Sequence, residues 1–145
     1  MKNRTYLRAL LSTMLVLSLG LMLAQGETSG AQSKVEITNA NFVAPTPEKE
    51  NLNGEWIEIA NGGEADQNLA GWTLTDQQNH TYAFPDFNLL AGAKVKVHTG
   101  SGEDTDEDLY CNRSTPIWNN DGDTATLTDA SGKAVAKYPN DGTGA

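Results

Sequence analysis

The chain has 145 residues, of which 19 are acidic and 10 are lysine or arginine, and its formal net charge is −9. A protein this acidic is repelled by nucleic-acid phosphates and by anionic lipid surfaces, so the composition excludes nucleic acid from the predicted partners. The single cysteine, Cys111, excludes an intramolecular disulfide bond.

The first residues carry the features of a secretory signal peptide. Residues 1–8 contain three basic side chains and no acidic one, and residues 9–24 form an apolar run. A basic start, a short apolar run and small residues after it are typical of a segment that is removed during export. We predict cleavage after Ala24 or after Ala31.

A retained membrane anchor is the alternative for this segment. The run of sixteen apolar residues is shorter than the roughly 20 that a helix needs to cross a bilayer. We therefore predict a secreted or cell-surface protein, with signal peptide and short spacer over residues 1–31 and no membrane span after signal removal. Loss of the three basic residues changes the net charge from −9 to −12, or to −11 if Glu27 is removed as well.

Short stretches of alternating apolar and polar residues follow the signal peptide. A period of two indicates half-buried β-strands, and turn residues separate the stretches at intervals of roughly 8 to 12 residues, which is typical of a β-sandwich or barrel. No stretch has the apolar period of a helix. In chain order the stretches cover residues 34–38, 41–43, 55–59, 69–75, 81–84, 91–98, 109–111, 116–118, 124–129 and 134–138.

The three tryptophans differ in the faces that they are expected to occupy. Ile57 and Ile59 share one face of their predicted strand, so Trp56 lies on the other face. Trp72 and Trp118 stand in apolar surroundings and are expected in the core. An exposed tryptophan is typical of a carbohydrate or protein contact, which makes Trp56 the candidate contact residue.

Two acidic segments are candidates for a calcium site, because carboxylate oxygens are the ligands that calcium prefers. Neither has the spacing of an EF-hand: counted from Asn119, the glycine position holds Thr124, and counted from Asp104, it holds Leu109. A solvated acidic loop is the alternative, and the two segments could also share an ion. The candidate ligands are Asp104, Asp106 and Asp108 in the first segment and Asp121 and Asp123 in the second.

The second acidic segment also has the composition of a tight turn. Asparagine and aspartate side chains bond to nearby backbone, and glycine supplies a positive φ. We predict that residues 119–123 form a hairpin turn, that Gly122 has a positive φ, and that Asp121 and Asp123 bond to local backbone or water. No metal or cofactor is then required.

Catalytic patterns are weak throughout the chain. Glu55 and Glu58 are three residues apart on a strand, which places them on opposite faces and not across one cleft. His80 and His98 are eighteen residues apart without a third histidine, and no GxSxG motif occurs. Cys111 follows Leu109 and Tyr110 and is interpreted as a buried thiol without a base. We therefore predict no catalytic residues. The alternative is a small secreted hydrolase or calcium-dependent surface protein that uses loop carboxylates.

The order of five motifs resembles the lamin tail domain family over Val35 to Tyr138. The motifs are GEWIEIANGG, LAGWTL, TYAFPDFNLLAGAKVKVHTGSG, DLYC and IWNNDGDTATLTDASGKAVAKY. This resemblance implies an all-β, immunoglobulin-like β-sandwich, of the type found as a module in exported prokaryotic proteins. The implied domain covers residues 34–139, and residues 140–145 are expected to form a flexible tail.

The resemblance implies an architecture and no chemistry, because it places no shared catalytic residues of the family on the positions of this chain. The chain departs from the family at Cys111 and Asn112, where related prokaryotic sequences often have an aromatic residue and glycine. No heptad run precedes the domain, so filament assembly is not implied. The expected function is that of a non-catalytic exported module that binds a protein or a cell-surface component, with its oligomeric state left open.

Overall fold

The computed structural model describes residues 34–140, which include the whole predicted domain. The predicted signal peptide, and the predicted tail beyond Asn140, lie outside the described residues. No helix within 34–140 is long and apolar enough to cross a membrane. The strands are β1 (Val35–Asn41), β2 (Trp56–Asn61), β3 (Gln67–Asn68), β4 (Thr73–Thr75), β5 (Thr81–Ala83), β6 (Asn88–Leu89), β7 (Lys94–His98), β8 (Asp108–Tyr110), β9 (Ala125–Thr128) and β10 (Ala134–Tyr138).

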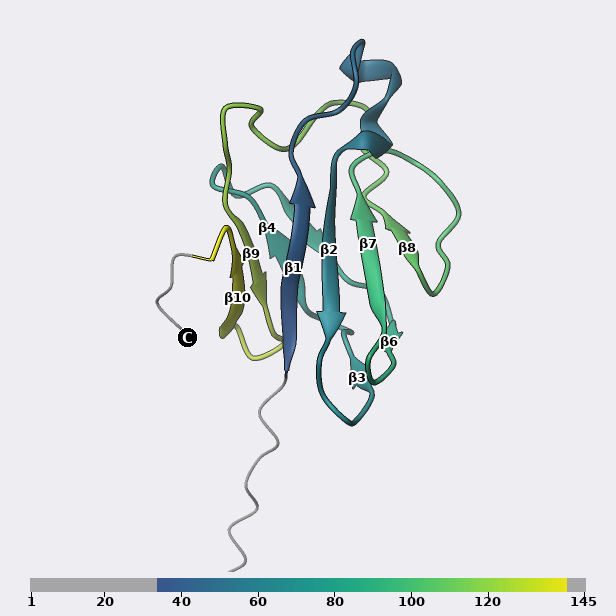
Figure 1. The fold of residues 1–145 in the computed structure, drawn as a ribbon, viewed down its shortest axis with the longest axis vertical. Helices are drawn as coiled ribbons and strands as arrows, with labels where there is room; N and C mark the ends of the chain where they lie inside the picture. The colour runs from purple at the N-terminus through teal and green to yellow at the C-terminus, as the bar shows by residue number, and fades with distance from the viewer. Residues whose placement is uncertain (1–33, 141–145) are drawn as a thin grey trace, which may run out of the picture. The chain divides into compact units, whose positions relative to one another are not determined.

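The strands form two principal sheets that pack face to face (Figure 1). The first sheet has the order β1-β2-β7-β8, and the second has the order β10-β9-β4-β5. All neighbours are antiparallel except β7 and β8, which run parallel. Strands β3 and β6 form a separate two-stranded sheet. The predicted all-β, immunoglobulin-like sandwich is thus confirmed.

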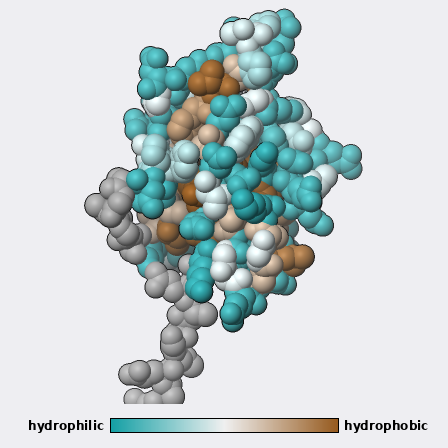
Figure 2. All heavy atoms as spheres, viewed as in Figure 1, coloured by the Kyte–Doolittle hydropathy of each residue, from teal (hydrophilic) through white to brown (hydrophobic). Residues whose placement is uncertain are grey.

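The core lies between the two sheets and consists of the apolar face of each strand. Ile57 and Ile59 of β2 pair with Val97 and Val95 of β7 on the inner face of the first sheet, and all four are buried. Leu127 of β9 is buried on the inner face of the second sheet. The face seen in Figure 2 is mostly hydrophilic, with apolar residues in small separate groups. Alternation along β2, β7 and β9 therefore separates core from surface as predicted.

One predicted apolar stretch is not a strand. Residues 116–118 lie in the segment between β8 and β9, where the N–H of Ile117 donates to the Glu55 carboxylate and not to a neighbouring strand. The short strands β3 and β6 and the two 3₁₀ turns, η1 (Glu48–Glu50) and η2 (Leu52–Gly54), are absent from the predicted elements. Strands of two residues and single 3₁₀ turns are too short to produce a recognisable period.

The prediction that residues 119–123 form a hairpin is wrong. Strand β8 belongs to the first sheet and β9 to the second, so the segment 111–124 crosses from one sheet to the other. A turn is nevertheless present, because the N–H of Gly122 donates to the carbonyl oxygen of Asn119 at 3.0 Å. Gly122 has a φ of +120°, which confirms the predicted positive φ.

Replacement of Gly122 tests the backbone strain in this turn. A β-carbon at Gly122 would meet no atom within 4 Å, so the substitution Gly122→Ala acts through its φ alone. We expect a loss of roughly 1–3 kcal/mol in the free energy of unfolding, measured by urea denaturation. Gly62→Ala is the matched control, since its β-carbon would make only an ordinary 3.5 Å contact with the Lys34 carbonyl oxygen. Equal losses in the two variants would contradict a conformational role for Gly122.

Candidate functional site

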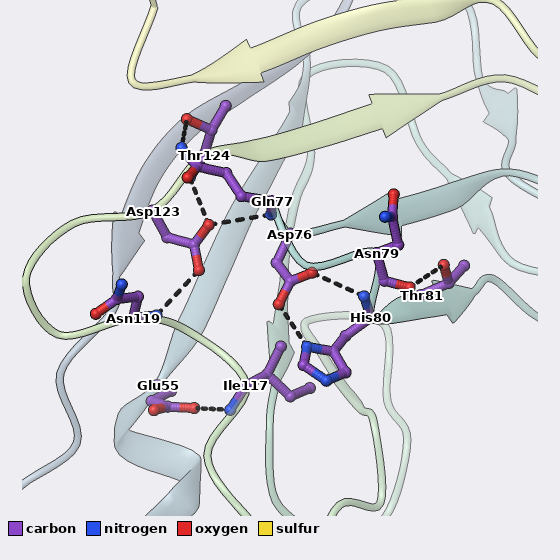
Figure 3. A network of polar contacts seen from close by, with 10 residues as sticks. All are labelled: Glu55, Asp76, Gln77, Asn79, His80, Thr81, Ile117, Asn119, Asp123 and Thr124. Carbon is purple, nitrogen blue, oxygen red and sulfur yellow. Dashed lines mark hydrogen bonds and ion pairs between the residues drawn. The ribbon is translucent and has the colours of Figure 1, made fainter.

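Asp123 lies in a polar network that ties the C-terminal end of the crossover segment to the turn after β4 (Figure 3). The residue is only 4% exposed. One carboxylate oxygen accepts the N–H groups of Thr124 at 2.7 Å and Gln77 at 3.2 Å, and the other accepts the N–H of Asn119 at 3.0 Å. The carboxylate therefore fixes its own turn and also ties that turn to the segment after β4.

A second buried aspartate holds the neighbouring turn between β4 and β5. Asp76 accepts the backbone N–H of His80 at 2.7 Å through one oxygen, and its other oxygen lies 2.6 Å from the Nδ1 atom of the same histidine (Figure 3). This arrangement closes the turn of residues 76–80 with a buried carboxylate. His80 thus serves as the partner of Asp76, a buried acid that no sequence motif indicates.

Glu55 is the third buried acid, with no exposed surface. Its Oε2 atom accepts the N–H of Ile117 at 3.1 Å, and its backbone carbonyl accepts the N–H of Thr99 at 3.1 Å. Its Oε1 atom and the Thr99 hydroxyl have no hydrogen-bond partner within residues 34–140. Burial raises the pKa of the Glu55 carboxyl above 4.5, against the hydrogen bond from Ile117, which lowers it.

This raised pKa predicts a pH-dependent stability. The folded state binds the Glu55 proton more tightly than the unfolded chain does, so the contribution is fully present below pH 4.5 and is lost as the pH rises through the folded-state pKa. We expect Glu55→Gln to abolish this decline. We also expect it to stabilise the protein by about 1 kcal/mol at pH 7, because the amide can accept from Ile117 and donate to the Thr99 hydroxyl.

Urea unfolding between pH 4 and pH 7 measures this effect. Glu58→Gln provides a control, because the contribution of Glu58 to stability depends on pH in the opposite direction. Glu58 accepts a hydrogen bond from Lys94 at 2.9 Å, which lowers its pKa. Its contribution is therefore present above the unfolded pKa and is lost as the pH falls. If Glu55→Gln were less stable than the wild type at pH 7, the buried carboxylate would be a net stabilising group, contrary to the prediction.

The first acidic segment closes the free edge of β8. Asp104 accepts the N–H of Tyr110 at 3.0 Å, and the Thr105 hydroxyl accepts the N–H of Asp108 at 3.0 Å. The N–H of Thr105 donates to the carbonyl oxygen of Asp108 at 2.8 Å. These bonds occupy backbone groups that an edge strand would otherwise offer to another chain. The segment is thus built into the sheet, with Asp106 exposed outside it.

The candidate calcium ligands lie in different environments. Asp108 is 2.7 Å from the Nε2 atom of His98, Asp123 is enclosed by backbone N–H groups, and Asp121 is exposed. Within residues 34–140, no three acidic, histidine or cysteine side chains are grouped so that they could hold a metal ion. Calcium binding is still a hypothesis, and the arrangement of these five residues does not favour it.

Trp56 lies on the outer face of the first sheet, where it is half-buried. The Nζ atom of Lys96 is 4.4 Å from the centre of its ring, a cation–π contact that covers part of it. Trp72 and Trp118 are buried in the core. Part of the Trp56 ring is therefore exposed to solvent, and part is covered by Lys96 of β7.

Cys111 is half-buried at the side of the sandwich next to β5. Burial raises the pKa of its thiol to about 12, so the thiol stays protonated at neutral pH and is a poor nucleophile. It lines a pocket of about 230 Å³ between the two sheets. No local sequence pattern indicates this pocket, because its walls come from strands far apart in the chain.

Comparison with known proteins agrees with this architecture. The model of the family described as Lamin Tail Domain matches residues 28–140, which is most of the chain. No curated protein matches at a significant level. The match covers all ten strands of the two principal sheets and the small sheet, together with the crossover that carries Asp123. The chain therefore belongs to the lamin tail domain family.

Proposed function

We propose that this protein is an exported, non-catalytic interaction module that binds a protein or another cell-surface component. The proposal rests on one observation: the acidic and histidine side chains are engaged in hydrogen bonds that hold loops and turns. Asp76, Asp123 and Glu55 are buried and bonded to backbone N–H groups. His98 lies between Asp108 and the carbonyl oxygen of Asn53. Groups committed to holding loops are not available to attack or protonate a substrate.

Export is supported by the basic and apolar start of the chain. The acidity of the remaining chain favours a protein or a neutral cell-surface component over nucleic acid and anionic lipid. Membership of an immunoglobulin-like family is also compatible with a binding role, since such sandwiches present loops and strand edges on a rigid scaffold. A hydrolase would instead need a cleft in which acids converge without structural partners.

The test begins with secretion of the full-length chain by the cells that produce it. We expect mass spectrometry to find an N-terminus between Gln25 and Ser33, and an intact Met1 on membrane-bound protein would contradict export. The secreted protein, labelled with a fluorophore, should bind saturably to the surface of the same cells.

A non-catalytic role predicts that this binding leaves the surface component chemically unchanged. Hydrolysis of surface polymers that disappears in an Asp104→Asn, Asp106→Asn variant would establish the loop-carboxylate enzyme instead. Absence of saturable surface binding by the wild type would reject the interaction module.

A further inference from the structure

The four outer strands of the two sheets differ in what lies at their free edges. Strands β1 and β10, at corresponding ends of the two sheets, pack against each other. The edge of β8 is closed by Asp104 and Thr105, as described above. Strand β5, at the remaining end of the second sheet, has no neighbour beyond β4 within residues 34–140. An unpaired strand edge of this kind is a template for pairing with another chain.

The register of β5 shows which backbone groups are free. The N–H of Phe84 donates to Trp72, and the carbonyl oxygen of His80 accepts from Asp76, so the even-numbered residues of this strand point their backbone groups toward β4. In an antiparallel ladder the alternate residues point theirs away. Thr81 and Ala83 therefore direct two N–H and two carbonyl groups to solvent, and both residues are exposed.

The pocket of about 230 Å³ lies directly beside this edge and opens between the sheets. Leu74, Val97 and Trp118 supply buried apolar walls. Tyr82 contributes from β5 itself, with Cys111 opposite it on the segment after β8. The combination of an open edge and an adjacent apolar pocket is what strand addition uses, because backbone bonds provide affinity and a pocket selects one side chain.

The charge at the rim of this pocket indicates which side chains a partner segment would carry. Arg113 lines the same pocket and is exposed, and its guanidinium forms no ion pair within the described residues. The other cationic candidate at the rim, His80, is held by Asp76. A free arginine beside an apolar pocket suits a segment in which an acidic residue follows an apolar one. A second copy of this chain is less suited, because each copy carries a strong negative charge.

We propose that the β5 edge and this pocket bind an extended segment of a partner protein, which adds to the second sheet as a fifth strand. The segment bonds to the backbone of Thr81 and Ala83, places one apolar side chain in the pocket, and pairs an acidic side chain with Arg113. This inference rests on the proposed interaction function and assigns it a surface.

A synthetic peptide tests the site with the full-length protein. The probe is the fluorescein-labelled heptapeptide TVTLTDV, a sequence that does not occur in the chain, which combines strand-favouring threonines and valines with a leucine and an aspartate. We expect saturable binding in fluorescence anisotropy. Ala83→Pro removes one free N–H from the edge and leaves the ladder to β4 intact, so it should weaken binding at least about tenfold. Ala134→Val, at an exposed position of β10 at the opposite end of the second sheet, is the control and should bind like the wild type.

A charge exchange tests the role of Arg113. Arg113→Glu should weaken binding of the aspartate peptide by about tenfold and should bind the corresponding lysine peptide more tightly than the wild type does. Thermal unfolding of each variant checks that the fold is retained. No binding of the aspartate peptide, or equal affinities for the wild type, Ala83→Pro and Arg113→Glu, would overturn the proposal.

Two further outcomes separate this proposal from the alternatives. If light scattering shows a dimer that Ala83→Pro dissociates, the occupant of the edge is a second copy, and the proposal of a partner segment is wrong. If the Ala83→Pro protein binds to cells as tightly as the wild type does, the interaction function stands and the β5 site is rejected. If the wild type does not bind to cells but does bind the peptide, the proposed function fails and the strand-addition site stands.

Discussion

Replacement of Asp123 by alanine is expected to lower the free energy of unfolding by about 3–5 kcal/mol. Hydrogen bonds to a charged group are each worth roughly 1.5–3 kcal/mol, and the three donors are only partly buried, so some of them will bond to water instead. The carboxylate accepts the N–H groups of Gln77, Asn119 and Thr124, which its removal leaves without their acceptor. The effect should also loosen the crossover between the sheets, since the bond to Gln77 joins it to the end of β4.

Asp121→Ala is the control for this loss. Asp121 belongs to the same turn and carries the same charge, but it is exposed. We expect its replacement to change the free energy of unfolding by no more than about 0.5 kcal/mol in urea denaturation. Similar losses in both variants would show that the charge of the loop, and not the hydrogen bonding of Asp123, determines its stability.

The same two aspartates test the calcium hypothesis. A ligand that binds only the folded protein raises its melting temperature by mass action. We expect millimolar calcium to shift the melting temperature of the wild type and of the Asp121→Asn, Asp123→Asn double variant equally. A calcium-dependent gain that the double variant loses would convert this turn into an ion site.

Replacement of Trp118 by alanine should cost about 3–5 kcal/mol, the usual range for removing a large aromatic side chain from a core. Trp118 is 6% exposed, and its ring centre lies 5.3 Å from that of Phe42. Its loss also removes a wall of the pocket beside β5. Urea denaturation should therefore show the loss of stability, and the peptide probe should show weaker binding under conditions where the variant is folded.

Trp56→Ala is the matched control, because it removes the same side chain from the outer face of the first sheet. Trp56 is half-buried and contacts Lys96, so the expected loss is on the order of 1 kcal/mol, mainly the cation–π contact and some apolar area. A loss as large as that of Trp118→Ala would show that the outer face is packed like a core. Retained stability with lost cell-surface binding would identify Trp56 as a contact residue.

Much of this fold could be predicted because alternation is a property of a few adjacent residues. In β2 and β7 the apolar side chains recur every second residue, so both the strands and their buried faces follow from the sequence. The turn at Gly122 is local in the same sense, since only glycine readily adopts its φ of +120°. The order of such motifs also sufficed to indicate the family.

The pairing of strands could not be predicted in this way. Strands β8 and β9 are separated by a segment that contains a well-formed turn, and the sequence pattern is the same whether that turn joins two paired strands or two sheets. The sheet that each strand joins depends on the strand with which it pairs, and β8 pairs in parallel with β7. That contact is made by residues distant from the turn, so no local pattern records it.

The roles of the acidic residues also depend on the tertiary structure. Asp121 and Asp123 are two residues apart in one turn and look equivalent in the sequence, yet one is exposed and the other is buried among three N–H donors. Glu55 becomes a buried acceptor because the crossover brings Ile117 against it. The sequence by itself determined where strands and turns form, through side-chain period and backbone φ. Only the tertiary structure decided which carboxylates are enclosed and which strand edge stays open, because burial and pairing depend on segments that meet only in the folded chain.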